Sequence, residues 1–336
     1  MSHISAFHRV RKAWHSALGA VALFSAAAFA NLCLADSASG DHKKVVGVTL
    51  VSLQSPYLII VVDAMKVEAA KQDIDLIFLD SARSVATESS QIESLIAKKV
   101  DLIVMNPVDQ KTSQAAAKLI NNAGIPLILL DARFTDDFTF GGGKFVAYVG
   151  SEDTVAGEIQ GQYLADKLPE GGNVVYLVIE YGLSATARRK AGFESVIKDH
   201  PNLTIVTEIQ GLSSRAKGKT IMEKLLHKYS KGNFRPLVAQ NDEMAIGASS
   251  AIQAADRLGE FKVLIGVNGL RPALDAVAAG TLSATVFQDP VGQGTQVVTA
   301  ASKILAGEAV APQVLIPFKL VTKENVSSFK DRKSVV

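Results

Sequence analysis

Short apolar runs alternate with amphipathic stretches of helical length along most of the chain. The apolar runs are rich in β-branched residues, which is typical of buried parallel strands. They lie at residues 45–50, 76–79, 101–105, 127–130, 147–150, 174–179, 203–208, 238–239, 263–267 and 284–287. The stretches between them predict helices at residues 56–71, 85–98, 111–122, 184–199, 215–230, 244–257, 272–279 and 291–306, and one more that opens at 151–153. Strict alternation of strand and helix predicts an α/β fold with doubly wound parallel sheets.

The predicted elements form two series of similar order. A chain of 336 residues is too long for one modest core, so we expect two α/β lobes. Residues 134–144, which include three consecutive glycines, interrupt the first series and predict a loop or an irregular hairpin. Residues 314–321 predict a last extended segment, and the polar tail from residue 323 is expected to fray.

The first residues have the pattern of an export signal. Three basic residues precede an Ala-rich apolar run at 17–30 that ends in small residues. We therefore expect residues 1–35 to be a secretory signal peptide and the mature protein to be periplasmic. The alternative is an uncleaved membrane anchor, because residues 18–35 could nearly span a bilayer. The high alanine content favours cleavage.

Charge and cysteine content exclude several classes of function. The formal net charge is +2, and without the basic residues of the signal segment the chain is nearly neutral, so a nucleic-acid partner is not expected. The single cysteine, Cys33, excludes an internal disulfide and a multi-thiolate metal site. No histidine lies at a metal-ligand spacing, so neither a metal site nor a cofactor is predicted.

Polar side chains follow many of the predicted strands at their carboxyl ends. In open α/β sheets small ligands bind at this edge. Each residue taken singly has the alternative role of a helix cap or turn residue. Together they offer hydroxyl, amide and carboxylate groups with one aromatic ring, a set that suits a neutral polyhydroxylated molecule. They are Ser55, Tyr57, Asn106, Asp131, Glu180, Asn241, Asn268 and Gln288.

The same edge shows no nucleophile paired with a base and no histidine. We therefore predict no catalytic residues and expect binding without chemistry. A dehydrogenase is disfavoured because no glycine-rich phosphate loop follows a strand. A cytoplasmic repressor of similar fold would need a DNA-binding helix-turn-helix where this chain has an export signal.

Several motifs of the chain are similar to those of one family. They are Ala239-Gln240-Asn241-Asp242-Glu243-Met244-Ala245-Ile246-Gly247-Ala248, Asn106-Pro107-Val108-Asp109, Gly124-Ile125-Pro126-Leu127, Ser52-Leu53-Gln54-Ser55-Pro56-Tyr57 and Arg189-Lys190-Ala191-Gly192-Phe193. On these residues the chain resembles the periplasmic sugar-binding proteins of ABC importers, most closely the ribose-binding type with the type I fold. The resemblance covers about residues 45–321, and the ten-residue motif is the most specific part of it.

The resemblance implies two lobes joined by a hinge that the chain crosses three times. One lobe would comprise residues 44–149 plus 290–317 and the other residues 151–287 plus 318–326, followed by a flexible tail at 327–336. A sugar or polyol would be trapped between the lobes by hinge closure. The protein would then be a monomer that delivers its ligand to an inner-membrane ABC permease. An alternative is a ligand-sensing module for a kinase or chemoreceptor, with the same fold and another partner.

The ligand contacts that the resemblance implies fall on one set of positions, and three of the family's charged positions differ here. The set is Ser55, Tyr57, Leu58, Asn106, Asp131, Asn241, Asn268 and Gln288. Arg133 is displaced by one residue from the usual place after Asp131, and Arg188 stands beside the usual arginine position. Both are therefore added as candidates. Asn268 replaces a carboxylate, so a polyol or modified sugar is expected rather than an ordinary pyranose.

Overall fold

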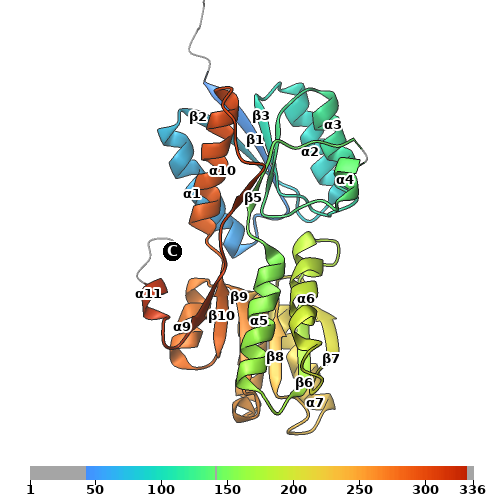
Figure 1. Ribbon diagram of the computed structural model, residues 1–336, viewed down its shortest axis with the longest axis vertical. Coiled ribbons are helices and arrows are strands. Elements are labelled where there is room, and N and C mark those ends of the chain that lie inside the picture. The colour runs from blue at the N-terminus through green and yellow to red at the C-terminus, as the bar shows by residue number, and fades with distance from the viewer. Residues whose placement is uncertain (1–42, 141, 331–336) are drawn as a thin grey trace, which may run out of the picture. The chain divides into compact units, whose positions relative to one another are not determined.

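The computed structural model describes residues 43–140 and 142–330 (Figure 1). Its first sheet combines the first series of strands with one strand from residues 313–315. The predicted signal peptide lies outside the described residues. All six strands of this sheet run parallel, in the order β11-β5-β4-β3-β1-β2. They are β1 (Lys44–Leu50), β2 (Ile74–Asp80), β3 (Leu102–Met105), β4 (Leu127–Leu130), β5 (Ala147–Gly150) and β11 (Gln313–Leu315).

The second sheet has the same design with one antiparallel edge. Its order is β12-β10-β9-β8-β6-β7, and only β12 runs against its neighbour. The strands are β6 (Gly172–Val178), β7 (Leu203–Gln210), β8 (Pro236–Ala239), β9 (Val263–Asn268), β10 (Ala284–Phe287) and β12 (Lys319–Thr322).

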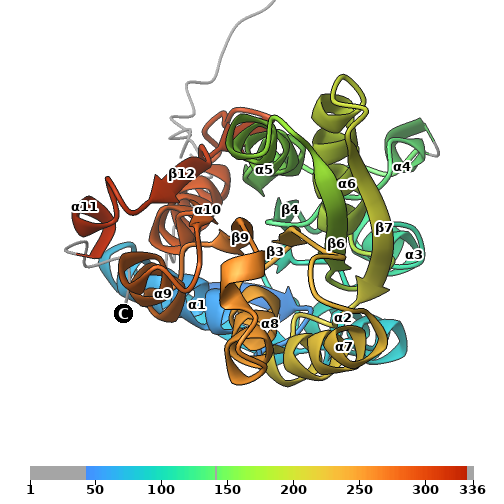
Figure 2. The same cartoon turned by 90° about the horizontal axis from the view of Figure 1, so that it is seen from below.

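Helices cover both faces of each sheet, which is why the central strands are mostly apolar rather than alternating. On the first sheet α1 (Pro56–Lys71) and α10 (Pro290–Leu305) bury one face, while α2 (Val85–Ala97) and α3 (Gln114–Asn122) bury the other. On the second sheet, α5 (Asp153–Lys167) and α6 (Ser184–Ile197) cover one face. The other face carries α7 (Arg215–Lys228), α8 (Asp242–Ala254) and α9 (Arg271–Ala279), with the short turn η1 (Leu258–Glu260) after α8 (Figure 2). The predicted pair of doubly wound sheets is confirmed.

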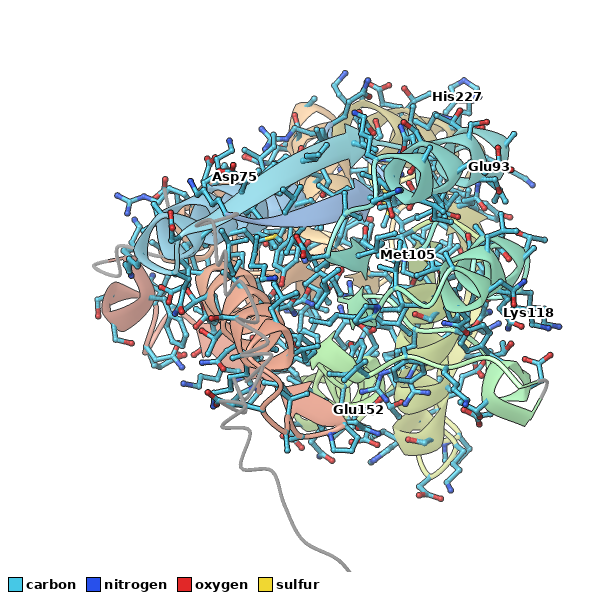
Figure 3. All side chains as sticks on the ribbon, turned by 90° about the horizontal axis from the view of Figure 1, so that it is seen from above. Asp75, Glu93, Met105, Lys118, Glu152 and His227 are labelled. Carbon is cyan, nitrogen blue, oxygen red and sulfur yellow. The ribbon has the colours of Figure 1, made fainter. Side chains whose placement is uncertain are left out.

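Most charged side chains lie at the outside of this arrangement, and the two cores are largely apolar. Viewed from above, Met105 lies among the side chains of the first sheet, whereas Asp75, Glu93 and Lys118 lie at the periphery (Figure 3). Met105 is fully buried. Among the described residues no helix is both long enough and apolar enough to cross a bilayer.

The chain passes between the two sheets three times. The crossings are residues 151–152 between β5 and α5, residues 288–289 between β10 and α10, and residues 316–318 between β11 and β12. This agrees with the three hinge crossings that the resemblance implies. Both sheets belong to one compact unit, which begins at Lys43.

Two segments differ from the prediction. The interruption after β4 contains a short helix, α4 (Asp137–Phe140), instead of only a loop or hairpin. The tail expected to fray forms helix α11 (Ser327–Lys330), which reaches the end of the described residues. Phe329 explains the second difference, because its side chain is buried and anchors an otherwise polar segment. The centroids of the Phe329 and Phe287 rings lie 5.2 Å apart.

Two glycines allow helices α5 and α6 to approach closely. A Cβ on Gly157 would collide with the backbone oxygen of Arg189, and one on Gly192 would collide with the backbone oxygen of Thr154. The contact fixes α6 against α5 and thereby positions Arg189, whose side chain reaches the site described below. The Arg-Lys-Ala-Gly-Phe motif is therefore partly a packing motif.

We predict that Gly192→Ala lowers the free energy of unfolding by about 1–3 kcal/mol, because the added methyl group forces α5 and α6 apart. Urea denaturation measures the change. Gly259→Ala is the matched control, since a Cβ at Gly259 meets nothing within 4 Å and should leave stability within about 0.5 kcal/mol of the parent. Equal stabilities for the two variants would contradict the close packing.

Candidate ligand-binding site

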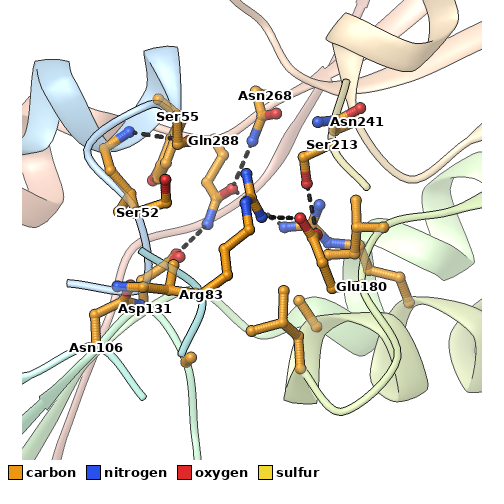
Figure 4. A pocket seen from close by; sticks show the side chains of 18 residues that line it. Ser52, Ser55, Arg83, Asn106, Asp131, Glu180, Ser213, Asn241, Asn268 and Gln288 are labelled. Carbon is orange, nitrogen blue, oxygen red and sulfur yellow. Dashed lines mark hydrogen bonds and ion pairs between the residues drawn. The ribbon is translucent and has the colours of Figure 1, made fainter. Parts of the chain in front are cut away.

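One cavity lies where the carboxyl ends of strands from both sheets meet (Figure 4). Its volume is ≈ 610 Å³ with the space open to solvent included. Parallel strands all end at the same edge of their sheet, so residues far apart in the sequence come together here. Eight of the ten predicted site residues line it: Ser55, Tyr57, Leu58, Asn106, Asp131, Asn241, Asn268 and Gln288.

Asp131 follows β4 and supplies a carboxylate to the cavity. Its Oδ1 accepts a hydrogen bond of 2.8 Å from Nε2 of Gln288, which follows β10 in the other sheet. Its backbone is in the left-handed region with φ of 61°, and its carbonyl accepts a 3.0 Å hydrogen bond from the hydroxyl of Tyr148. This conformation is uncommon outside glycine but is tolerated by Asp and Asn. It turns the carboxylate away from the strand and into the cavity.

The surroundings of Asp131 favour its neutral form. Removal from water and the nearby carboxylate of Asp153 raise the pKa of Asp131 to about 6, against the opposing effects of Arg189 and of hydrogen bonds from Gln293 and Gln288. At neutral pH the cavity therefore holds a carboxylate that is incompletely hydrated. Such a group gains from hydrogen-bond donors that a ligand can bring.

Asn106 is held by the sheet that it terminates. Its Oδ1 accepts from the backbone N–H of Val51 at 3.1 Å, and its Nδ2 donates to the carbonyl of Leu130 at 3.0 Å. One N–H of the amide remains for a ligand. The predicted residue therefore lines the cavity with its orientation fixed by two backbone groups.

Asn241 combines the two roles that the sequence left open. Its Oδ1 accepts from the backbone N–H of Met244 at 3.0 Å, which caps helix α8. Its Nδ2 has no partner among the described residues, and the residue lines the cavity. The cap therefore orients the amide so that its N–H groups are available to a ligand.

Asn268 ends β9 in a strained backbone conformation, with φ of 124°. Its Nδ2 donates to Oε1 of Gln288 at 3.1 Å, and the residue is mostly buried. Strained residues of this kind persist only where neighbouring contacts hold them, and they gather at ligand sites. The following Gly269, also at positive φ, allows the chain to turn sharply after the strand.

The sequence did not single out Arg189, which also lines the cavity. Only 5% of its side chain is exposed, and its guanidinium donates to Asp153 Oδ1 at 2.8 Å and to Gln288 Oε1 at 3.3 Å. The nearby carboxylates of Asp153 and Asp131 raise its pKa although burial opposes this. Arg189 lies in the middle of helix α6 and does not follow a strand, so its place in the sequence did not predict a site residue. Only the Arg-Lys-Ala-Gly-Phe motif contained it.

The structure does not bring Arg133 and Arg188 into the cavity, which corrects their expected placement. Both guanidinium groups pair with Glu152 instead, at 3.2 Å from Arg133 and at 3.0 Å from the Nε of Arg188. Arg133 also lies 4.0 Å above the ring of Tyr148. The residue that lines the cavity after Asp131 is Ala132, so the one-residue displacement turns Arg133 away.

A charged part of the cavity wall joins the two sheets. Arg83, after β2, forms an ion pair with Glu180, after β6 (Figure 4). Ser213 donates to the second oxygen of Glu180 at 2.8 Å. Glu180, one of the polar strand-end residues in the sequence, therefore acts between the sheets as well as at the cavity.

Two further hydrogen bonds of 2.8 Å cross between the sheets beside this wall. One runs from the backbone N–H of Gln110 to the carbonyl of Gly182, and the other from the backbone N–H of Arg133 to Ser184 Oγ. Together with the ion pair, these bonds hold the loops of the two sheets in contact. The cleft is therefore closed in this structure.

The site has the chemistry of a binding pocket. Within the part of the chain that the structure describes, no group of three or more potential ligands could hold a metal ion. Donors and acceptors come from both sheets and face one cavity, part of which is open to solvent. Since unpaired buried groups cost about 1–3 kcal/mol each, such a site selects ligands with matching hydroxyl groups.

We predict that Asp131→Asn raises the melting temperature of the ligand-free protein near pH 7.5. The pKa of Asp131 is raised from 3.8 to about 6 in the folded state, so the protonated form is favoured by folding and the charged form is disfavoured. Its stabilising contribution is complete below pH 3.8 and is lost as the pH rises through 6. The difference between variant and parent should therefore be largest above pH 6 and small near pH 4. A difference that does not vary with pH would contradict the proposed burial of the charge.

Comparison with known proteins places this geometry in a family. Residues 46–309 match the model of a periplasmic binding protein domain. The chain is 31% identical over 288 residues to the ribose import binding protein of Escherichia coli, covering 86% of this chain and 94% of that protein. It is 33% identical over 295 residues to a putative rhizopine-binding protein of Rhizobium meliloti, covering 87% and 94%.

A solved structure of a similar protein has the same fold. An ABC transporter solute binding protein from Bacillus halodurans with bound myo-inositol is 34% identical and superimposes with a TM-score of 0.80, covering 86% of this chain and 97% of that one. The resemblance seen in the sequence motifs is thus confirmed over nearly the whole described length. The chain belongs to the periplasmic binding protein family.

Proposed function

We propose that this protein captures a sugar or polyol between its two sheets and delivers it to an ABC importer. The observation that carries the proposal is the convergence of Asp131, Asn241, Asn268 and Gln288 on one closed cavity. Carboxylate and amide groups pair with the neighbouring hydroxyls of a polyol. Members of this family are binding proteins, which confirms the expectation of binding without catalysis.

The lining favours a ligand with polar groups on several sides. Tyr57 is the only aromatic residue among the described residues that line the cavity. At most one aromatic ring can therefore pack against the C–H face of a ligand. Another part of the wall is formed by Arg83, Glu180 and Ser213. The relatives named for ribose import and the structure with bound myo-inositol both concern polyhydroxylated molecules.

The proposal also includes the location of the mature protein and its partner. We place the mature protein in the periplasm as a monomer, with residues 1–35 as its signal peptide. The importer role is preferred to a sensor role because relatives above 30% identity are named as import binding proteins. The partner is then an inner-membrane ABC permease that recognises the closed form.

A thermal-shift screen of pentoses, hexoses and polyols tests the proposal, with isothermal titration calorimetry for each hit. Binding to the folded state should raise the melting temperature in a concentration-dependent manner. D-ribose and myo-inositol are the first probes. The absence of a shift with every compound would overturn the proposal.

We predict that Asn241→Ser weakens binding of the tightest ligand by about 1–3 kcal/mol, because the amide donors are lost. Serine retains an oxygen that can cap α8, so the folded state should be preserved. Calorimetric titration measures the change. Asn202→Ser, on an exposed residue that does not line the cavity, is the control and should bind like the parent. Parent-like affinity for both variants would show that the amide does not contact the ligand.

We predict that Glu180→Gln shifts the ligand-free protein toward an open form, because the attraction between Glu180 and Arg83 across the cleft is lost. The radius of gyration measured by small-angle X-ray scattering should increase. The affinity should fall by about two- to fivefold, as expected for a partly exposed ion pair. Glu243→Gln is the matched control, since Glu243 pairs with Arg215 within the second lobe. An unchanged radius of gyration in Glu180→Gln would contradict the bridging role.

A further inference from the structure

The hydroxyl group of Tyr57 is an exception among the buried tyrosines. The residue is 5% exposed, its hydroxyl oxygen is covered, and that oxygen has no hydrogen-bond partner among the described residues. By contrast, the hydroxyl of Tyr148 lies within hydrogen-bond distance of two backbone carbonyls, and Tyr163 donates to one at 3.2 Å. The hydroxyl of Tyr176 accepts from Gln240 at 3.2 Å. Buried polar groups are usually paired, so an unpaired one requires an explanation.

The position of Tyr57 supplies that explanation. Tyr57 lines the cavity and is the second residue of α1, directly after Pro56. The side chain of Ser55 caps this helix by accepting from Leu58 N, so the first turn is fixed. The phenol is therefore held at the cavity wall by a rigid helix start rather than by a loop.

The hydroxyl of Tyr57 carries a hydrogen that has no acceptor among the described residues. Burial and the carboxylate of Asp131 raise the pKa of Tyr57 well above its usual value, while Arg189 opposes the shift. The phenol is thus protonated at neutral pH. A partner must then offer an acceptor, and hydroxyl and ring oxygens of sugars and polyols are acceptors.

We infer that the Tyr57 hydroxyl donates a hydrogen bond to an oxygen of the bound ligand and is a specificity-determining group of the site. The inference rests on the proposed function and adds to the ring-face role that the sequence suggested. The ligand should carry an oxygen at the position facing Tyr57. A deoxy analogue without that oxygen would leave the phenol unpaired and should be rejected.

Tyr57→Phe tests the inference because it removes only the hydroxyl. The variant should bind the tightest of the screened sugars and polyols about five- to tenfold more weakly, since one hydrogen bond is lost. Without ligand it should melt at the same temperature as the parent or at one roughly 1–3 °C higher, because an unpaired buried group is removed. Calorimetric titration and thermal melting give the two values.

Tyr163→Phe is the matched control, since its hydroxyl is paired and does not line the cavity. It should melt at a lower temperature than the parent and bind ligand equally well. A third arm titrates monodeoxy analogues of the tightest ligand against parent and Tyr57→Phe. For the analogue that lacks the contacted oxygen, the affinity difference between the two proteins should disappear.

The outcomes separate the two proposals. Weaker binding by Tyr57→Phe without loss of thermal stability supports the inference. Unchanged affinity overturns it while the proposed function stands, because the parent still binds. If the parent binds no sugar or polyol, the proposed function fails and the inference fails with it.

Discussion

The hydrogen bond between the Asp131 carboxylate and the Gln288 amide connects the two sheets at the base of the cavity. Gln288 also accepts hydrogen bonds from Arg189 and Asn268, so one amide links groups from several elements. Because Arg189 is in turn paired with Asp153, the charges behind the cavity are neutralised within the protein. Gln288 therefore holds its neighbours in place, and Asp131 is a charged cavity residue that has no ion-pair partner of its own among the described residues. Removing water from this network makes each of its contacts stronger and each missing partner more costly.

The order of elements could be predicted because buried parallel strands and amphipathic helices have distinct patterns. The same reasoning located eight cavity residues, since strand ends converge in any doubly wound sheet. The roles of these residues in binding stay predictions. Arg133 and Arg188 were placed by proximity in sequence, and a displacement of one residue directs a side chain elsewhere, here to Glu152. The Arg83–Glu180 pair could not be predicted either, because it joins loops of separate sheets and depends on how these sheets face each other.

Backbone strain marks the same edge of the sheets independently of side-chain chemistry. Asp131 and Asn268 both have positive φ and both follow or end a central strand. A strained conformation at a strand end lowers stability by about 1–3 kcal/mol, so it persists where it orients a useful group. The two residues come from different sheets, and both hydrogen-bond to Gln288. The same structural requirement therefore explains both backbone conformations. That requirement is the direction of their polar groups into the closed cavity.

The second crossing between the sheets consists of residues 288–289, and Gln288 is therefore both a hinge residue and a wall of the cavity. Any rotation of one sheet relative to the other changes the torsion angles of this segment and moves its amide against Asp131. The angle between the sheets and the shape of the cavity around Gln288 are consequently coupled, so that one changes with the other. A ligand that moves the Gln288 amide would therefore change the orientation of the two sheets directly, without a relay of intermediate residues. A receptor that touches only the outer surfaces could in this way distinguish a loaded molecule from an empty one.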